Sequence, residues 1–136
     1  MSYLLDTSIV IGYLRKVPSV GEFINGKIDK GVNFYLSSVS IGELYAGIYS
    51  SGDKPKGIHD VQIFMQSEEI DLVDFDLDMA EEFGRMVAYL KEKGTPVPKS
   101  DVMLGATANV LGVPIATMDK RHFPVLEKVG VYVKII

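Results

Sequence analysis

Short apolar segments that each lead toward a helix-like segment constrain the fold of this chain more than any other feature of its sequence. The first, Tyr3-Leu4-Leu5, ends at Asp6, and Asp6-Thr7-Ser8 supplies side chains that can cap a helix over residues 9–14. Strands are expected over residues 3–5, 33–37, 70–75, 113–117 and 131–135. Such strands, alternating with helices, favour a parallel sheet that is covered on both faces.

The expected helices fill the intervals between these strands. Pro18 suits the first turn of a helix that Gly31 closes, and Asp76 can cap a long amphipathic helix that stops at Gly94. Further helices are expected over residues 40–49, 58–65, 99–109 and 123–128, with an exposed loop at 50–57 and a rigid turn at 95–98. The 136 residues fit one three-layer α/β/α domain, residues 1–136, around a mainly parallel five-stranded sheet.

The composition excludes several classes of site. The apolar stretches are shorter than the roughly 20 residues that cross a bilayer, and no secretory signal is recognisable, so we expect a cytoplasmic protein. The chain has no cysteine, and its two histidines, His59 and His122, lack partners at the spacing of a zinc site. Both histidines are expected on the surface or in loops, and any metal is expected to be held by oxygen.

Four acidic residues occupy positions from which a metal site could be built. Asp6 and Asp119 follow expected strands, at the carboxyl ends where parallel sheets collect their ligand sites. Glu43 and Asp101 lie in the first turns of expected helices, where an acidic residue also interacts favourably with the helix dipole. For each of these two residues, this structural role explains the acid as well as a metal site does. Both have apolar neighbours, however, and a buried, unpaired carboxylate costs several kcal/mol unless it has a partner or a metal.

Clustered carboxylates suit Mg²⁺ or Mn²⁺, which take oxygen ligands and complete their shell with water and substrate phosphate. Such an ion can activate water for in-line attack on a phosphodiester. The formal net charge of -4 argues against a broad basic surface for nucleic acid. That argument weakens if four carboxylates share one pocket, because the rest of the surface is then formally neutral.

Three segments, YLLDTSIVIGYL, SSVSIGELYAGIYSS and KSDVMLGATANVLGVPIATMDKRHF, together resemble the PIN-domain family, especially its VapC-type toxin ribonucleases. A strand followed by Asp-Thr-Ser, a serine three residues before Glu-Leu, Asp-x-x-x-x-Ala-Thr-Ala and Thr-x-Asp-x-x-x-Phe occur in this order and span nearly the whole chain. The resemblance implies a metal-dependent endoribonuclease, the toxin of a VapBC-type toxin-antitoxin system, that hydrolyses RNA phosphodiester bonds with a metal-activated water.

The same resemblance assigns roles to individual residues and implies Mg²⁺ or Mn²⁺ as the cofactor. The catalytic and metal-binding set is Asp6, Glu43, Asp101 and Asp119. The polar neighbours that orient this set are Thr7, Ser40 and Thr117. Another polar residue can stand at the place of Asp119 in the family, so direct ligation and the holding of a metal-bound water are both open for it.

Partners also follow from the resemblance. Proteins of this type form homodimers, and VapC toxins are inhibited by a VapB-type antitoxin whose peptide segment covers the catalytic groove. The basic residues next to the candidate ligands, which could meet RNA phosphates or simply be solvated, are Lys99, Lys120 and Arg121. An acidic run is interpreted as a solvated strand face and a helix cap rather than a second metal site: Asp71, Asp74, Asp76 and Asp78.

Two other functions stay open. A PIN-like module could bind RNA or protein without cutting, because a fold does not guarantee activity. An aspartate-based phosphatase also carries an aspartate at the end of its first strand. Asp6-Thr7-Ser8 lacks the second aspartate two residues on that the haloacid-dehalogenase phosphatases use, which disfavours this alternative.

Overall fold

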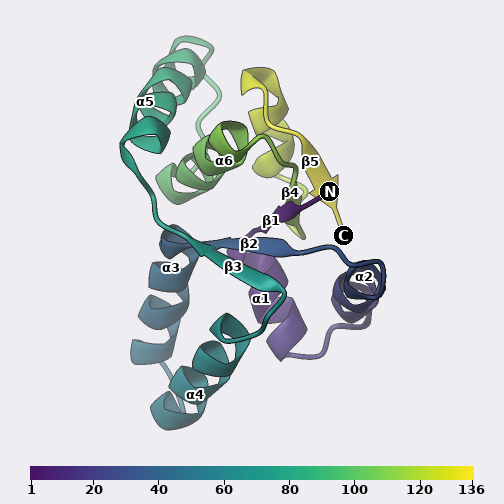
Figure 1. Cartoon of the computed structure of the whole chain (residues 1–136). Helices are drawn as coiled ribbons and strands as arrows, with labels where there is room; N and C mark the ends of the chain where they lie inside the picture. The colour runs from purple at the N-terminus through teal and green to yellow at the C-terminus, as the bar shows by residue number, and fades with distance from the viewer.

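A five-stranded sheet runs through the centre of the computed structural model, which describes all 136 residues. All pairs of neighbouring strands are parallel, in the order β3-β2-β1-β4-β5 (Figure 1). The strands are β1 (Tyr3–Leu5), β2 (Phe34–Ser37), β3 (Ile70–Val73), β4 (Ile115–Thr117) and β5 (Val133–Ile135). The expected parallel five-stranded sheet is confirmed; β1 has the predicted bounds, and the other four strands are shorter than the sequence predicts.

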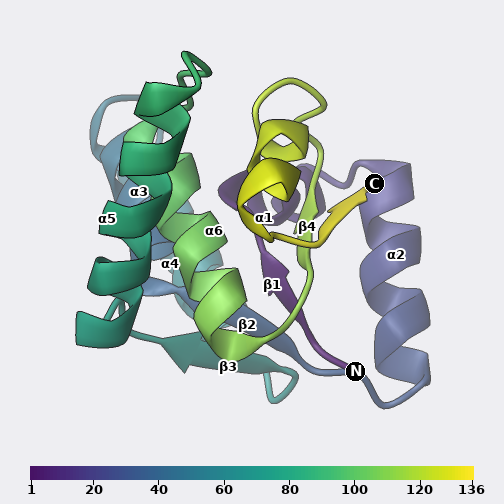
Figure 2. The same ribbon diagram turned by 90° about the horizontal axis from the view of Figure 1, so that it is seen from above.

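The helices form a layer on each face of this sheet. They are α1 (Thr7–Leu14), α2 (Pro18–Asp29), α3 (Ser38–Tyr49), α4 (Lys54–Met65), α5 (Leu77–Glu92), α6 (Lys99–Leu111) and the 3₁₀ helix η1 (Phe123–Val129). Figure 1 shows α5 and α6 above the sheet and α1, α2 and α4 below it. Both views show α5 and α6 side by side (Figure 2). No helix combines the length and the apolar character that crossing a membrane would take.

Alternation along β1 explains the three layers. Tyr3 and Leu5 belong to an apolar cluster with buried side chains of α1 to α4, whereas Leu4 belongs to a second cluster with α5, α6 and η1. Successive side chains of a strand point to opposite faces, so a strand buried on both faces has to be apolar throughout. Leu4 and Leu5 are fully buried. The three-layer α/β/α architecture is thereby confirmed.

Three helices begin earlier than the sequence predicts, and a capping side chain accounts for each. Asp6 accepts a hydrogen bond from the Thr7 N–H, so α1 starts at Thr7 and not at Ile9. Ser37 accepts a hydrogen bond from the Val39 N–H, so α3 starts at Ser38 and not at Ser40. Asp53 accepts one from the Lys56 N–H, with Pro55 in the first turn, so α4 starts within the expected loop. The prediction of a loop over residues 50–57 is wrong for its second half.

The strand order creates a switch point between β1 and β4. From β1 the chain moves outward through β2 to β3, and it returns on the other side of β1 as β4. Gly112 ends α6 with a φ of 69°, a left-handed conformation that glycine adopts readily, and turns the chain toward β4. Crevices at such switch points, beyond the carboxyl ends of the strands, are the usual ligand sites of parallel sheets.

Candidate metal centre

Four acidic residues converge at this switch point, each from a different element. Asp6 directly follows β1, and Asp119 lies two residues beyond the end of β4. Asp101 is in the first turn of α6, whereas Glu43 is the sixth residue of α3 and so lies beyond the first turn. The helix dipole therefore gives little reason for an acid at Glu43. The charges of the other three carboxylates all raise the pKa of Asp101.

Asp6 is buried, with 5% of its surface exposed, and is held by three hydrogen bonds. Its Oδ1 accepts from the Thr7 N–H at 2.7 Å, and its Oδ2 accepts from the hydroxyls of Ser8 at 2.6 Å and Thr117 at 2.7 Å. Burial raises the pKa of Asp6 above its ordinary value. The hydrogen bonds from these three donors stabilise the charged carboxylate and therefore oppose the rise. Asp6 is thus a fixed anchor of the site.

Thr7 holds Glu43 and also contacts Ser40. Thr7 Oγ1 lies 2.7 Å from Glu43 Oε1 and 3.0 Å from Ser40 Oγ. A carboxylate oxygen accepts, so the Thr7 hydroxyl donates to Glu43, and the same hydroxyl is within donating distance of Ser40 Oγ. Of the polar neighbours expected from the sequence, Thr7 and Thr117 bond acidic residues directly, whereas Ser40 contacts Thr7.

Ser8 is a site residue that sequence reasoning missed. Its hydroxyl donates to Asp6 and accepts from the Met118 N–H at 3.1 Å, and Thr117 Oγ1 accepts from the Asp119 N–H at 2.9 Å. These two hydroxyls tie the loop after β4 to the loop after β1. The Asp-x-Ser spacing was visible in the sequence, but its partner lies 110 positions away.

Asp101 shows the electrostatic cost of bringing the carboxylates together. Burial, followed by the charges of Asp6, Asp119 and Glu43, raises the pKa of Asp101 to about 6. Its side chain is 15% exposed, and no lysine or arginine lies within salt-bridge distance of any of the four carboxylates. A divalent cation would remove this repulsion, so the residues present fit a metal such as Mg²⁺ or Mn²⁺.

Asp119 is oriented by the turn that follows it. Its Oδ1 accepts from the Arg121 N–H at 2.7 Å and the His122 N–H at 3.0 Å. Burial raises the pKa of Asp119, but these backbone donors and the His122 ring outweigh it, and the pKa falls below its ordinary value. Its other oxygen, Oδ2, lies 3.0 Å from His122 Nδ1.

His122 lies in the loop after β4, as expected, but its ring also contacts two of the acidic residues. Its side chain is 31% exposed, and its Nδ1 also lies 3.9 Å from Asp101 Oδ2. His122 has no partner at a zinc-type spacing, because its neighbours are Asp119, three residues earlier, and Asp101 on α6. His59 is exposed on α4, as expected.

The remaining charged candidates lie around the site rather than in it. Lys99, Lys120 and Arg121 are exposed, and Lys99 Nζ lies 5.9 Å from the centre of the Phe83 ring. The acidic run is also exposed, and its Asp76 caps α5 by accepting from the Met79 N–H at 2.9 Å. This geometry is that of the solvated strand face and helix cap inferred from the sequence.

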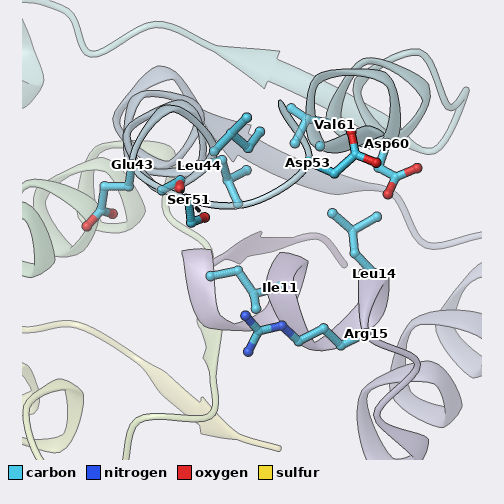
Figure 3. A pocket seen from close by; sticks show the side chains of 12 residues that line it. Ile11, Leu14, Arg15, Glu43, Leu44, Ser51, Asp53, Asp60 and Val61 are labelled. Atoms are coloured by element: carbon cyan, nitrogen blue, oxygen red, sulfur yellow. Dashed lines mark hydrogen bonds between the residues drawn. The ribbon is translucent and has the colours of Figure 1, made fainter. Parts of the chain in front are cut away.

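A groove of about 340 Å³ reaches the centre from one side. It lies between α1, α3 and α4, and six of its lining residues are Ile11, Leu14, Arg15, Glu43, Leu44 and Val61. Figure 3 shows Glu43 at one end of the groove, with Asp53 and Asp60 toward the other end. The groove is therefore partly apolar and continuous with the acidic cluster at Glu43.

The parallel three-layer fold, with an acidic cluster at its switch point, is that of an α/β protein whose site lies beyond the carboxyl ends of its strands. The family model of the PIN domain matches residues 3–129. The chain belongs to the PIN-domain family, which confirms the resemblance seen in its motifs.

Relatives of known type agree with this assignment. The chain is 31% identical over 131 residues to the tRNA(fMet)-specific endonuclease VapC of Shigella flexneri, covering 96% of this chain and 93% of that protein. The structure is similar to DNA-bound VapBC from Salmonella typhimurium, with a TM-score of 0.86, 25% identity and coverage of 98% and 97%. VapBC2 from Rickettsia felis, bound to promoter DNA, shares the fold with a TM-score of 0.83, 20% identity and 98% coverage of both chains.

Replacing Asp101 with Asn should stabilise the metal-free protein at neutral pH. Because the pKa of Asp101 is raised from 3.8 to about 6, the folded state binds its proton more tightly than the unfolded state does. The ionised group therefore destabilises the fold above about pH 6, and this penalty disappears as the pH falls toward 4. We expect Asp101→Asn to raise the free energy of unfolding by about 1 to 3 kcal/mol at pH 7.5, with little gain near pH 4.

Urea unfolding in chelator at both pH values measures this gain. Asp71→Asn, which changes an exposed aspartate of β3, is the control and should stay within about 0.5 kcal/mol of wild type. An Asp101→Asn protein that is no more stable than wild type at pH 7.5, or equally stabilised at both pH values, would contradict the account.

Proposed function

We propose that this chain is a metal-dependent endoribonuclease, the toxin of a VapBC-type toxin-antitoxin system, which acts on RNA in the cytoplasm. The observation that carries the proposal is the convergence of four carboxylates, without a neutralising lysine or arginine, at the switch point of a PIN-domain sheet. Its relatedness to a VapC endonuclease that is named for a tRNA supports RNA as the substrate.

The acidic residues divide the work between them. Asp101 accepts no hydrogen bond from the protein, and Asp119 has its Oδ2 directed toward Asp101 and His122, so these oxygens are available as ligands. Asp6 accepts three hydrogen bonds, which hold its carboxylate in one position in the site. When bound, a divalent cation supplies Lewis acidity, lowering the pKa of water and offsetting charge on the phosphate.

Glu43 is placed to handle the proton. Its Oε1 is engaged by Thr7, which holds the side chain in one orientation, while its Oε2 has no hydrogen bond to the protein. A carboxylate within reach of an attacking water can take its proton as a general base. The exposed Lys120 and Arg121, directly after Asp119, are proposed to meet RNA phosphates that the acidic cluster alone would repel.

The phosphatase alternative fits this geometry poorly. A nucleophilic aspartate needs an oxygen that is free to attack phosphorus. Both oxygens of Asp6 accept hydrogen bonds, and 5% of the residue's surface is exposed. Asp6 therefore acts as an anchor and ligand in the proposed mechanism rather than as a nucleophile.

We also propose that the groove between α1, α3 and α4 receives a segment of a VapB-type antitoxin. The groove is partly apolar and ends at Glu43, so a peptide lying in it would approach the acidic cluster. The similar structure from Salmonella typhimurium is a VapBC complex. A homodimer, as in other proteins of this type, completes the proposed assembly.

RNA cleavage should depend on both the cation and the carboxylates. With Mn²⁺ or Mg²⁺, the wild type should cleave members of a structured RNA panel that includes initiator tRNA, and chelator should abolish cleavage. Asp6→Asn and Asp101→Asn should each lower the rate by about 100-fold or more, because several kcal/mol of charge stabilisation is lost. Cleavage sites mapped to the nucleotide by primer extension provide the measurement.

Asp74→Asn, at an exposed aspartate outside the cluster, is the matched control and should cleave at the wild-type rate. Full cleavage in chelator, or a fully active Asp101→Asn enzyme, would be inconsistent with the proposed mechanism. Cation binding without cleavage of any RNA in the panel would favour the non-cutting PIN-like module instead.

Filling the groove should block the antitoxin. Gly47 lines the groove on α3, is exposed, and has no atom within 4 Å of the place where a Cβ would lie. We expect Gly47→Phe to weaken capture of the small protein encoded directly upstream by at least about tenfold, as a loss of 1.4 kcal/mol would. Pull-down after co-expression, followed by a binding titration, measures the loss.

Gly42→Phe makes the same change on α3 at a glycine that is also open but does not line the groove, and it should bind normally. Equal binding by Gly47→Phe and Gly42→Phe would place the partner elsewhere. The absence of a small upstream reading frame would argue against the toxin assignment itself.

A further inference from the structure

We infer that the His122 imidazole is a ligand of the same cation as Asp101 and Asp119, and that it makes the centre favour Mn²⁺ over Mg²⁺. The inference rests on the proposed metal centre but goes beyond the carboxylates that define it. It gives one of the two histidines of the chain a direct role in choosing the ion.

The distances fit one coordination shell. His122 Nδ1 lies 3.0 Å from Asp119 Oδ2 and 3.9 Å from Asp101 Oδ2. Each of the three residues offers one ligand atom that lies within 4.8 Å of those of the other two. Ligand atoms bound at about 2.1 Å to an octahedral ion are about 3.0 Å apart when adjacent and about 4.2 Å apart when opposite. The 3.0 Å distance equals that of adjacent ligands, and the 3.9 Å distance falls between the adjacent and opposite values.

The local fold fixes His122 in this place. Asp119 Oδ1 accepts from the backbone N–H groups of Arg121 and His122, which closes a tight turn and brings the imidazole back toward Asp119 Oδ2. The next residue, Phe123, is buried in the cluster beneath α6 and begins η1. The backbone of His122 is thus fixed on one side by the turn at Asp119 and on the other by the buried Phe123.

The His122 ring can do more than form a hydrogen bond with Asp119. Nδ1 faces two carboxylate oxygens, and Asp101 accepts no hydrogen bond from any protein donor. In the tautomer protonated at Nε2, the Nδ1 lone pair is available as a ligand. Nδ1 and the two oxygens then face one another as three donors to a cation.

The nitrogen donor determines the ion preference. Mg²⁺ is hard and is typically bound by one or two carboxylates and waters, whereas imidazole is a good ligand for first-row transition ions. A centre of two carboxylates and one imidazole therefore favours Mn²⁺ over Mg²⁺, compared with a centre of oxygen alone. An imidazole that only oriented Asp119 would support both ions alike.

Pulsed electron paramagnetic resonance of the Mn²⁺-loaded protein tests the inference directly. Electron spin echo modulation from a directly bound imidazole nitrogen is expected in the wild type and in His59→Gln, which removes the other histidine. The modulation should be lost in His122→Gln. Bound Mn²⁺ without nitrogen modulation in the wild type, or modulation that persists in His122→Gln, overturns the inference.

Competition titrations of Mn²⁺ and Mg²⁺ provide a second readout. We expect His122→Gln to weaken Mn²⁺ binding by about tenfold or more and Mg²⁺ binding less. Equal weakening of both ions would reduce His122 to a positioning residue and overturn the inference, while the proposed function would stand. Failure of the wild type to bind Mn²⁺ at all would instead overturn the metal centre and the proposed function together.

Discussion

Repulsion among carboxylates brought together from four distant segments is the constraint on which the rest of this structure depends. The charges of Asp6, Glu43 and Asp119 add to burial in holding the pKa of Asp101 far above its usual range. Such a cluster persists only if the fold is stable enough to hold it against that repulsion. The two apolar clusters on either face of the sheet supply this stability, since burial of side chains such as Leu4 and Leu5 contributes about 1.5 to 3 kcal/mol each.

Hydroxyl groups on this scaffold form hydrogen bonds that hold the carboxylate oxygens in a defined arrangement. Thr7 orients Glu43. Ser8 and Thr117 donate hydrogen bonds to Asp6, and both also accept hydrogen bonds from backbone N–H groups of the loop after β4. The loops after β1 and β4 therefore cannot shift independently. No buried side-chain nitrogen or oxygen lacks a hydrogen-bond partner, so the network is complete and leaves the outward-facing carboxylate oxygens for ligands.

Much of the fold was predictable, because strand alternation, caps and glycine stops are local signals. Asp6 and Asp119 followed from their places after strands, and Asp76 and Gly112 marked a helix start and a helix end. The start of α4 was missed although Asp53 and Pro55 signalled it, since the polar composition of residues 50–57 suggested a loop. Ser8 and His122 were missed because their contacts join residues that no spacing rule connects: Ser8 contacts Met118, and His122 lies near Asp101 of α6.

The central claim is that these separate carboxylates form one cation site, and anomalous X-ray diffraction from Mn²⁺-soaked crystals tests it most directly. We expect the strongest manganese peak between Asp101 and Asp119, at about 2.2 Å from their oxygens. A crystal with no peak at this position, or with its strongest peak on the exposed acidic run of β3 and α5, would contradict the claim.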